Sequence, residues 1–226
     1  LKKIVETGVD FVELSVDSIV EFDDSKKDYT RSKKVFKLLL KYKKKHGFGL
    51  KTSLVLTAKN VDTIVETIKK INEKHKVPLT ISFIRKTVND VEDDESLFFN
   101  TKESKEKLTK VLDQIVKLKK NGARIMDPYY YFEGIKKFVQ KSFEWDCMAG
   151  KHSFAVDYDG SILLCASMEP SKKYNILDID KSFFKQKQEE FNKTKKWCTK
   201  ICYSVCHNTS GHFINHPIKA ILGQTF

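Results

Sequence analysis

The chain of 226 residues contains 40% hydrophobic residues, among them 16 phenylalanines, which supports a real core and argues against a disordered segment. No apolar run reaches the roughly 20 residues that a membrane helix requires, so a membrane protein is not expected. The net charge of +12 suggests nucleic-acid binding, yet only Arg31, Arg85 and Arg124 are arginine, the side chain suited to bidentate contacts with phosphates and bases. Most lysines lie opposite the apolar stripes of predicted helices, so nucleic-acid binding is not the favoured function.

Short apolar runs alternate with amphipathic helical patterns over the first 125 residues. The predicted strands are residues 9–16, 50–57 and 79–84, with a further short strand at 123–126. The predicted helices lie within about 32–45, over the apolar positions 61–71 with Asn60 as the expected N-cap, and over 108–121. Strands that alternate with helices in this way indicate parallel strands with crossover helices, and therefore an α/β layer or barrel.

Each predicted strand has one partly polar face. Alternate positions place Glu13, Ser15 and Asp17 together on the first strand, while Ser53 and Thr57 lie on the partly polar face of the second. Strands buried on both faces usually have nearly continuous apolar sequences, unlike these. The pattern favours a barrel whose interior binds a polar ligand, and an open sheet with one solvated face is the alternative.

The last part of the chain has a different organisation. An aromatic helix is predicted at residues 127–140, with a domain boundary between about 126 and 145. Two short strands, 154–158 and 161–165, are expected to be joined at Asp159 and Gly160, a pair typical of tight hairpin turns. A further amphipathic helix is predicted at 182–193, and the segment after Cys206 has no clear pattern.

The five cysteines all lie in the last third of the chain: Cys147, Cys165, Cys198, Cys202 and Cys206. Clustered thiols indicate a shared metal or a disulfide framework, and the odd number together with an enzyme-like α/β body disfavours disulfides. One alternative is zinc, bound by the last three cysteines with His207 or His212. The other is a four-iron cluster bound by Cys147, Cys165 and two of the last three. The histidines of this region are otherwise expected to be polar surface residues.

The cysteine-bearing segments resemble those of a known family. The segment WDCMAGKHSFAVDYDGSILLC, from Trp145 to Cys165, resembles the opening of the SPASM or twitch domains of radical S-adenosylmethionine (SAM) enzymes. The later run WCTKICYSVC resembles the closing cysteines of those domains. Upstream, GVDFVELSVDS and LVLTAKNVDTI resemble two successive strands of the radical SAM barrel, so the likeness covers nearly the whole chain.

The resemblance implies an α/β fold with three parts. These are a partial radical SAM (TIM-like) barrel with parallel strands at residues 1–126, a bridging helix at 127–144, and a SPASM- or twitch-like domain with a β-hairpin and helices at 145–226. A full SPASM domain carries more cysteines, so one auxiliary cluster is expected. The CxxxCxxC motif that binds the family's catalytic cluster is absent from this sequence. We therefore expect a fragment that begins about halfway through the barrel, or a degenerate member, and no SAM cleavage by this part alone.

The resemblance also implies a chemistry. In this family SAM and a catalytic 4Fe-4S cluster generate a 5′-deoxyadenosyl radical, which modifies a peptide or small molecule. The residues implied to bind SAM are Glu13, Ser15, Asp17 and Ser53, and the five cysteines are the candidate ligands of an auxiliary 4Fe-4S cluster. No catalytic residue is assigned. A cytoplasmic location and a reductant such as ferredoxin or flavodoxin are expected. The competing interpretation is a zinc-stabilised RNA- or peptide-binding module on an α/β scaffold.

Overall fold

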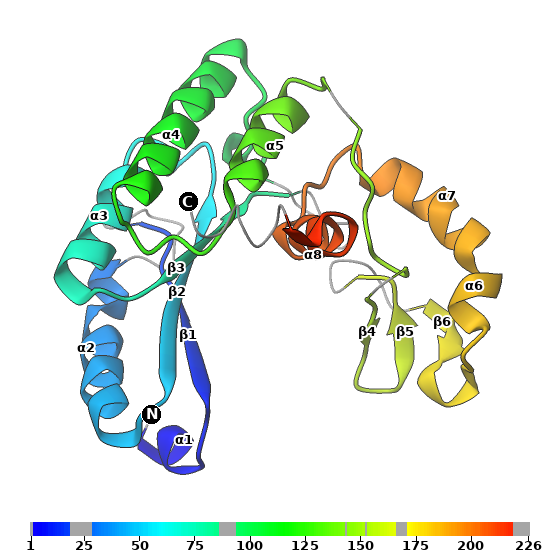
Figure 1. The fold of residues 1–226 in the computed structure, drawn as a ribbon, viewed down its shortest axis with the longest axis horizontal. Helices are drawn as coiled ribbons and strands as arrows, with labels where there is room; N and C mark the ends of the chain where they lie inside the picture. Colours follow the sequence, from blue (N-terminus) through cyan, green and yellow to red (C-terminus); the bar gives the residue numbers. More distant parts are fainter. Residues whose placement is uncertain are drawn as a thin grey trace. The chain divides into compact units, whose positions relative to one another are not determined.

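The structure, a computed structural model, describes residues 2–18, 29–85, 94–142, 144–151, 153–165 and 171–218. The chain divides into two compact units. The first contains residues 1–84 and 96–136, and the second contains residues 85–95 and 137–225. Figure 1 traces the helices and strands of both units along the chain.

The first unit contains a parallel sheet of three strands. These are β1 (Phe11–Ser15), β2 (Gly49–Leu56) and β3 (Leu79–Phe83), in that spatial order (Figure 1). The helices are α1 (Lys2–Glu6) before β1, α2 (Tyr29–His46) and α3 (Ile64–His75) between successive strands, and α4 (Lys102–Lys120) after β3. The predicted alternation of helices and parallel strands is confirmed, and within the described residues the three strands form an open sheet rather than a closed barrel.

The two faces of this sheet differ as predicted. Leu54 and Ile81 are fully buried on one face, whereas Ser53 and Thr80 on the other are only half-buried. On the apolar face, Leu50 belongs to a buried cluster that includes side chains of α2. Burying apolar surface stabilises by about 25 cal/mol per Å², so the packing of this face against α2 stabilises the unit.

Side chains, rather than a fourth strand, close the outer edge of β3. Leu79 pairs with Ile125 through one isolated parallel bridge. Beyond it, the Asp127 carboxylate accepts a hydrogen bond from the Ile81 N–H at 2.6 Å, and the Tyr131 hydroxyl accepts one from the last residue of β3 at 3.0 Å. The predicted fourth strand is therefore reduced to a single bridge, because Asp127 and Tyr131 bind the donors that a longer strand would have used.

The N-cap prediction for Asn60 is wrong. The N-cap of α3 is Thr63, and its side chain makes no capping hydrogen bond. Asn60 is buried, and its amide donates to the carbonyl oxygens of Asp17 (2.9 Å) and Val55 (2.7 Å) while accepting from the Thr57 N–H (2.9 Å). The side chain thus satisfies three partly buried backbone groups where two strands end, and this requirement outweighs helix capping.

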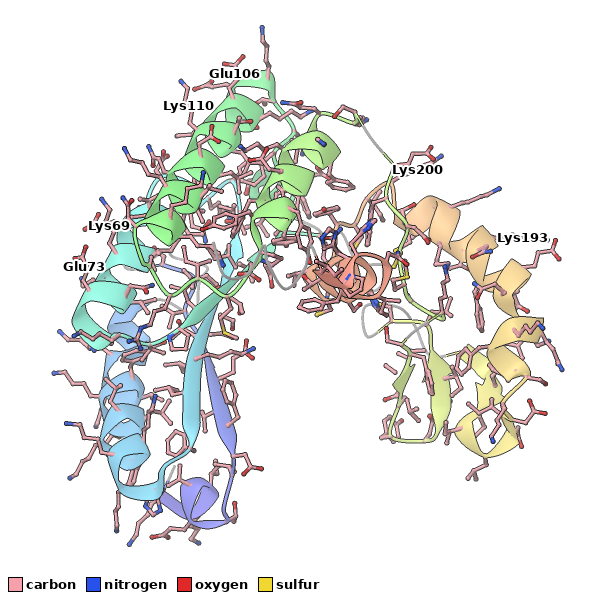
Figure 2. The ribbon with its side chains drawn as sticks, in the orientation of Figure 1. Lys69, Glu73, Glu106, Lys110, Lys193 and Lys200 are labelled. Atoms are coloured by element: carbon pink, nitrogen blue, oxygen red, sulfur yellow. The ribbon has the colours of Figure 1, made fainter. Side chains whose placement is uncertain are left out.

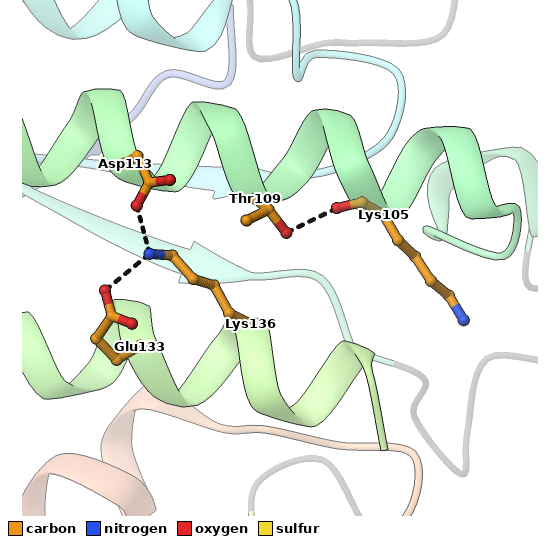
Figure 3. A network of polar contacts seen from close by, with 5 residues as sticks. All are labelled: Lys105, Thr109, Asp113, Glu133 and Lys136. Carbon is orange, nitrogen blue, oxygen red and sulfur yellow. Dashed lines mark hydrogen bonds and ion pairs between the residues drawn. The ribbon is translucent and has the colours of Figure 1, made fainter. Parts of the chain in front are cut away.

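The helix α5 (Tyr129–Val139) lies within the predicted aromatic helix and crosses the division between the two units. Its Lys136 ammonium donates to Glu133 at 2.8 Å and also to Asp113 of α4 (Figure 3). Burial lowers the pKa of Lys136, but these two carboxylates outweigh the effect of burial and raise the pKa overall.

Helix α4 begins with a capping box between Thr101 and Ser104, which satisfies two otherwise unpaired backbone donors.

The second unit contains a small antiparallel sheet and three further helices. The strands are β4 (Ala155–Val156), β5 (Ser161–Leu163) and β6 (Ser171–Asn175), and the helices are α6 (Phe183–Gln186), α7 (Gln188–Cys198) and α8 (Val205–Asn215). Two short 3₁₀ turns, η1 (Glu95–Leu97) and η2 (Ile176–Asp178), complete the described elements. The predicted hairpin is confirmed with shorter strands, and its Gly160 adopts a φ of 84° that suits glycine.

Three features of this unit differ from the prediction. Strand β6 was not predicted. The single helix expected at 182–193 is two helices that meet at Lys187, which ends α6 and caps α7. Helix α8 was also missed, because its sequence mixes histidine, asparagine, serine and glycine without an apolar stripe.

The lysine-rich helices carry charges of both signs on their exposed sides. Figure 2 shows Lys69 with Glu73 on α3 and Glu106 with Lys110 on α4, and all four residues are exposed. Acidic residues one turn away from lysines dilute the positive potential of these helix faces. Among the helices that the structure describes, none is both long and apolar enough to cross a membrane.

Candidate functional site

The five cysteines lie in four different environments of the second unit. Cys147 and Cys202 are buried, Cys198 is the half-buried last residue of α7, Cys165 is half-buried after β5, and Cys206 is exposed on α8. Their segments are distant in sequence, so any proximity between the thiols comes from the fold of this unit.

Four of these thiols lie close enough for their charges to interact. Cys147 feels the charges of Cys198 and Cys165, and Cys202 feels those of Cys198 and Cys165 in turn. Cys198 and Cys202 are also joined by a direct side-chain hydrogen bond. Within the described part of the chain, Cys206 does not take part in the interactions resolved among these thiols. The charges of Cys198 and Cys165 thus act on both Cys147 and Cys202 within this unit.

The thiols differ in how readily they ionise. Burial raises the pKa of Cys147 to about 11. The hydrogen bond from Cys202 lowers the pKa of Cys198 to about 7, with further lowering by the charges of His207 and Arg85. The same hydrogen bond, together with burial, raises the pKa of Cys202. Cys198 is thus the thiol most readily available as a thiolate, the form that binds metal, although the negative end of α7 alone would disfavour that charge.

Hydrogen bonds hold the two cysteine-bearing segments side by side. The Trp145 indole N–H donates to the carbonyl oxygens of Thr199 (3.2 Å) and Cys202 (3.0 Å). In the opposite direction, the Lys195 ammonium of α7 donates to the Cys147 carbonyl oxygen at 3.3 Å. These contacts keep the backbone before and at Cys147 close to the run that begins at the end of α7.

Close packing brings α8 against the same region. A Cβ atom at Gly211 of α8 would lie 2.7 Å from Met148, the neighbour of Cys147, so glycine is needed for this approach. One helical turn earlier, His207 is nearly buried, and its Nδ1 lies 3.2 Å from the Ser153 hydroxyl. His207 was expected on the polar surface and is instead part of the packing around the thiols.

The thiols do not form a preformed single-ion site. In the part of the chain that is described, no three or more histidine, cysteine or acidic side chains are grouped so that they could hold a metal ion. A four-iron cluster instead distributes four thiolates around a larger inorganic core. The cationic side chains that act on these thiols are Lys195, which acts on Cys147, and Arg85, which acts on Cys198.

The SAM-binding residues implied by the sequence lie on the polar face of the first unit's sheet. The Ser15 and Ser53 hydroxyls are 3.1 Å apart, and Glu13 forms an ion pair with Lys51 at 2.8 Å. Asp17 accepts a hydrogen bond from the Val55 N–H at 3.1 Å, so its carboxylate also ties β1 to β2. Glu13, Ser15 and Ser53 are therefore adjacent on one accessible face, while Asp17 has a structural bond there.

Sequence reasoning missed the groups that surround the thiols. Trp145, Lys195 and His207 each contact a cysteine-bearing segment or influence a thiol; Trp145 and Lys195 were not selected at all, and His207 was named only as a ligand of the alternative zinc site. Trp145 precedes Cys147 by two positions, and Lys195 lies three positions before Cys198 on the same helix. The helical spacing was a usable signal for Lys195, because residues three apart share a helix face.

Comparisons with known proteins reveal a likeness of fold. No family model matches the chain, and no curated protein matches it in sequence. Solved structures of anSMEcpe match the chain in fold: the native protein with bound AdoMet has a TM-score of 0.55 and 18% identity, over 99% of this chain and 70% of that one. The form with AdoMet and the Kp18Cys peptide gives 0.53 and 18%, over 99% and 71%. At this identity the likeness establishes a shared mixed α/β fold.

Proposed function

We propose that this chain is part of a radical SAM enzyme, with an auxiliary 4Fe-4S cluster in its second unit. The observation that supports the proposal is the electrostatic coupling of Cys165 and Cys198 to both Cys147 and Cys202. The fold likeness to anSMEcpe, an anaerobic sulfatase-maturating radical SAM enzyme, supports the same assignment independently.

In this proposal Cys147, Cys165, Cys198 and Cys202 would hold the auxiliary cluster and Cys206 would be spare. Such a cluster supplies one-electron transfer when all four ligand positions are thiolates. The protein's contribution is to bury two of the thiols, to compensate the cluster's negative charge and to exclude solvent from it.

SAM would lie against the polar face of the sheet in the first unit. Hydroxyls of Ser15 and Ser53 and the carboxylate of Glu13 can hydrogen-bond amino and hydroxyl groups of the ligand, since all three are accessible. The Glu13–Lys51 pair places charges of both signs there, as suits a ligand that carries an amine and a carboxylate. A catalytic 4Fe-4S cluster would complete the enzyme.

A binding measurement tests the SAM site. Ser15→Val removes an exposed hydroxyl at the end of β1, and we expect it to weaken SAM binding about tenfold, corresponding to about 1.4 kcal/mol for a lost hydrogen bond. Isothermal titration calorimetry under anaerobic conditions measures the change. Thr7→Val is the matched control and should bind as the wild type does, because the Thr7 hydroxyl donates to the local Ile4 carbonyl and to no other group in the described residues. Equal affinity in both variants, or no binding in any, would reject this site.

We further propose a peptide or small-molecule substrate and a reductant protein such as ferredoxin or flavodoxin. The anSMEcpe structures with bound AdoMet and a peptide support the peptide class. A small protein reductant suits a buried cluster, because electrons rather than atoms must reach it.

Metal analysis separates this proposal from its competitor, a zinc-stabilised RNA- or peptide-binding module. After anaerobic reconstitution we expect about four iron and about four acid-labile sulfide per chain. The zinc module would contain about one zinc and no sulfide. Stoichiometric zinc in the purified chain would reject the iron–sulfur assignment.

A further inference from the structure

Lys195 is a buried lysine that has no anionic partner among the described residues. Its side chain lies on α7 in a residue that is only 8% exposed, and its ammonium donates to the Cys147 carbonyl oxygen at 3.3 Å. Among the residues described, no carboxylate lies within ion-pair distance of it. A buried charge of this kind is costly unless an opposite charge lies nearby, so its surroundings indicate an anion.

The groups nearest to Lys195 identify that anion. Its charge acts on the Cys147 thiol, and Cys198 lies one helical turn further along α7. Four thiolates outweigh the positive charge of an iron–sulfur core, so the centre assigned to this place is an anion. Reduction adds one electron and therefore one more negative charge to the cluster. A buried cation nearby stabilises the reduced cluster more strongly than the oxidised cluster.

We propose that Lys195 is the positioning residue that compensates the charge of the auxiliary cluster, raising its reduction potential while fixing the Cys147 backbone. This inference rests on the proposed function and extends it to a residue outside the cysteine set. The lysine acts through its charge and through its hydrogen bond to the ligand's carbonyl, without coordinating iron.

The experiment compares reduction midpoint potentials of anaerobically reconstituted full chains. In each titration, dithionite is the reductant and each cluster accepts one electron, with no bond formed or broken. Electron paramagnetic resonance measures the fraction of clusters that is reduced. Lys195→Met removes the charge with little change in volume, and Lys195→Arg keeps the charge. Lys193→Met is the matched control, because Lys193 is an exposed lysine of the same helix (Figure 2).

We expect a lower potential in Lys195→Met, a potential near that of the wild type in Lys195→Arg, and no change in Lys193→Met. A second outcome also supports the inference. Circular dichroism shows that Lys195→Met is folded, this variant loads no iron, and Lys195→Arg does load iron, so the positive charge is needed for cluster assembly. An unchanged potential in Lys195→Met would overturn it, as would failure of both Lys195 variants to load iron. A wild-type chain that loads no iron would instead overturn the proposed function itself.

Discussion

Replacing any one of Cys147, Cys165, Cys198 or Cys202 by alanine is expected to abolish the broad visible charge-transfer absorption of the reconstituted chain. Each substitution removes one of the four thiolates that the cluster requires, and the remaining three would leave an iron atom exposed. Iron content should fall from about four per chain to well below about one in each variant. The measurement is an absorption spectrum with iron analysis after anaerobic reconstitution.

Cys206→Ala is the matched control for this series. Cys206 is exposed on α8, outside the thiol interactions resolved in the described residues, so its removal should leave both the absorption and the iron content unchanged. The choice of ligands among Cys198, Cys202 and Cys206 would be wrong if Cys206→Ala lost the cluster while a Cys198 or Cys202 variant kept it.

Asp127→Asn is expected to stabilise the folded chain at neutral pH. Burial raises the pKa of the Asp127 carboxyl from 3.8 to about 6, against the lowering effects of the Ile81 hydrogen bond and of the Lys119 and Lys51 charges. A rise of this size corresponds to about 3 kcal/mol of free energy of unfolding. An asparagine side-chain oxygen still accepts the Ile81 N–H, without the cost of a buried negative charge.

The pH dependence has a definite sign. Below pH 3.8 both the folded and the unfolded chain hold the proton, and the carboxyl's stabilising contribution is fully present. As the pH rises from there to about 6, the folded state holds the proton longer, so stability is lost across this window and remains lower above it. Asp127→Asn should remove this loss, giving a gain of up to about 3 kcal/mol at pH 7.5 that vanishes near pH 4.

Urea unfolding at several pH values measures this difference. Tyr131→Phe provides the control, because it removes the neighbouring acceptor at the edge of β3 without removing a carboxyl. We expect Tyr131→Phe to cost about 1–3 kcal/mol at every pH, as for a buried donor left without a partner. A gain for Asp127→Asn that does not change with pH would contradict the assigned ionisation.

Much of the fold follows from local patterns that tertiary contacts do not override. The strands around Leu54 and Ile81 have strict alternation, and α4 has four apolar positions at helical spacing, so their existence and facing are readable from the sequence. The role of Asn60 was predicted wrongly because an asparagine side chain can either cap a helix or hydrogen-bond backbone groups at the end of a strand. Only the three-dimensional position of the Asp17 carbonyl decides between these two roles. The strand predicted around Ile125 was too long, because the side chains of Asp127 and Tyr131 accept the backbone hydrogen bonds of β3 that a longer strand would have accepted.

The candidate site is partly predictable for a similar reason. Cysteine spacing selects the thiols, since chemistry restricts which residues bind clusters, but it does not choose among the last three. That choice depends on how α7 ends and α8 begins, which leaves Cys198 and Cys202 in contact and Cys206 exposed. The surrounding groups Trp145 and Lys195 have no motif of their own, because their roles depend on backbone carbonyls brought close by the fold.

The most direct test of this account is the X-ray absorption spectrum of the anaerobically prepared chain at the iron edge. The account predicts iron surrounded by sulfur with a second iron nearby, the signature of a cluster, and the loss of that signal in Cys147→Ala. Zinc bound to sulfur or nitrogen, with no iron neighbour in the spectrum, would contradict it.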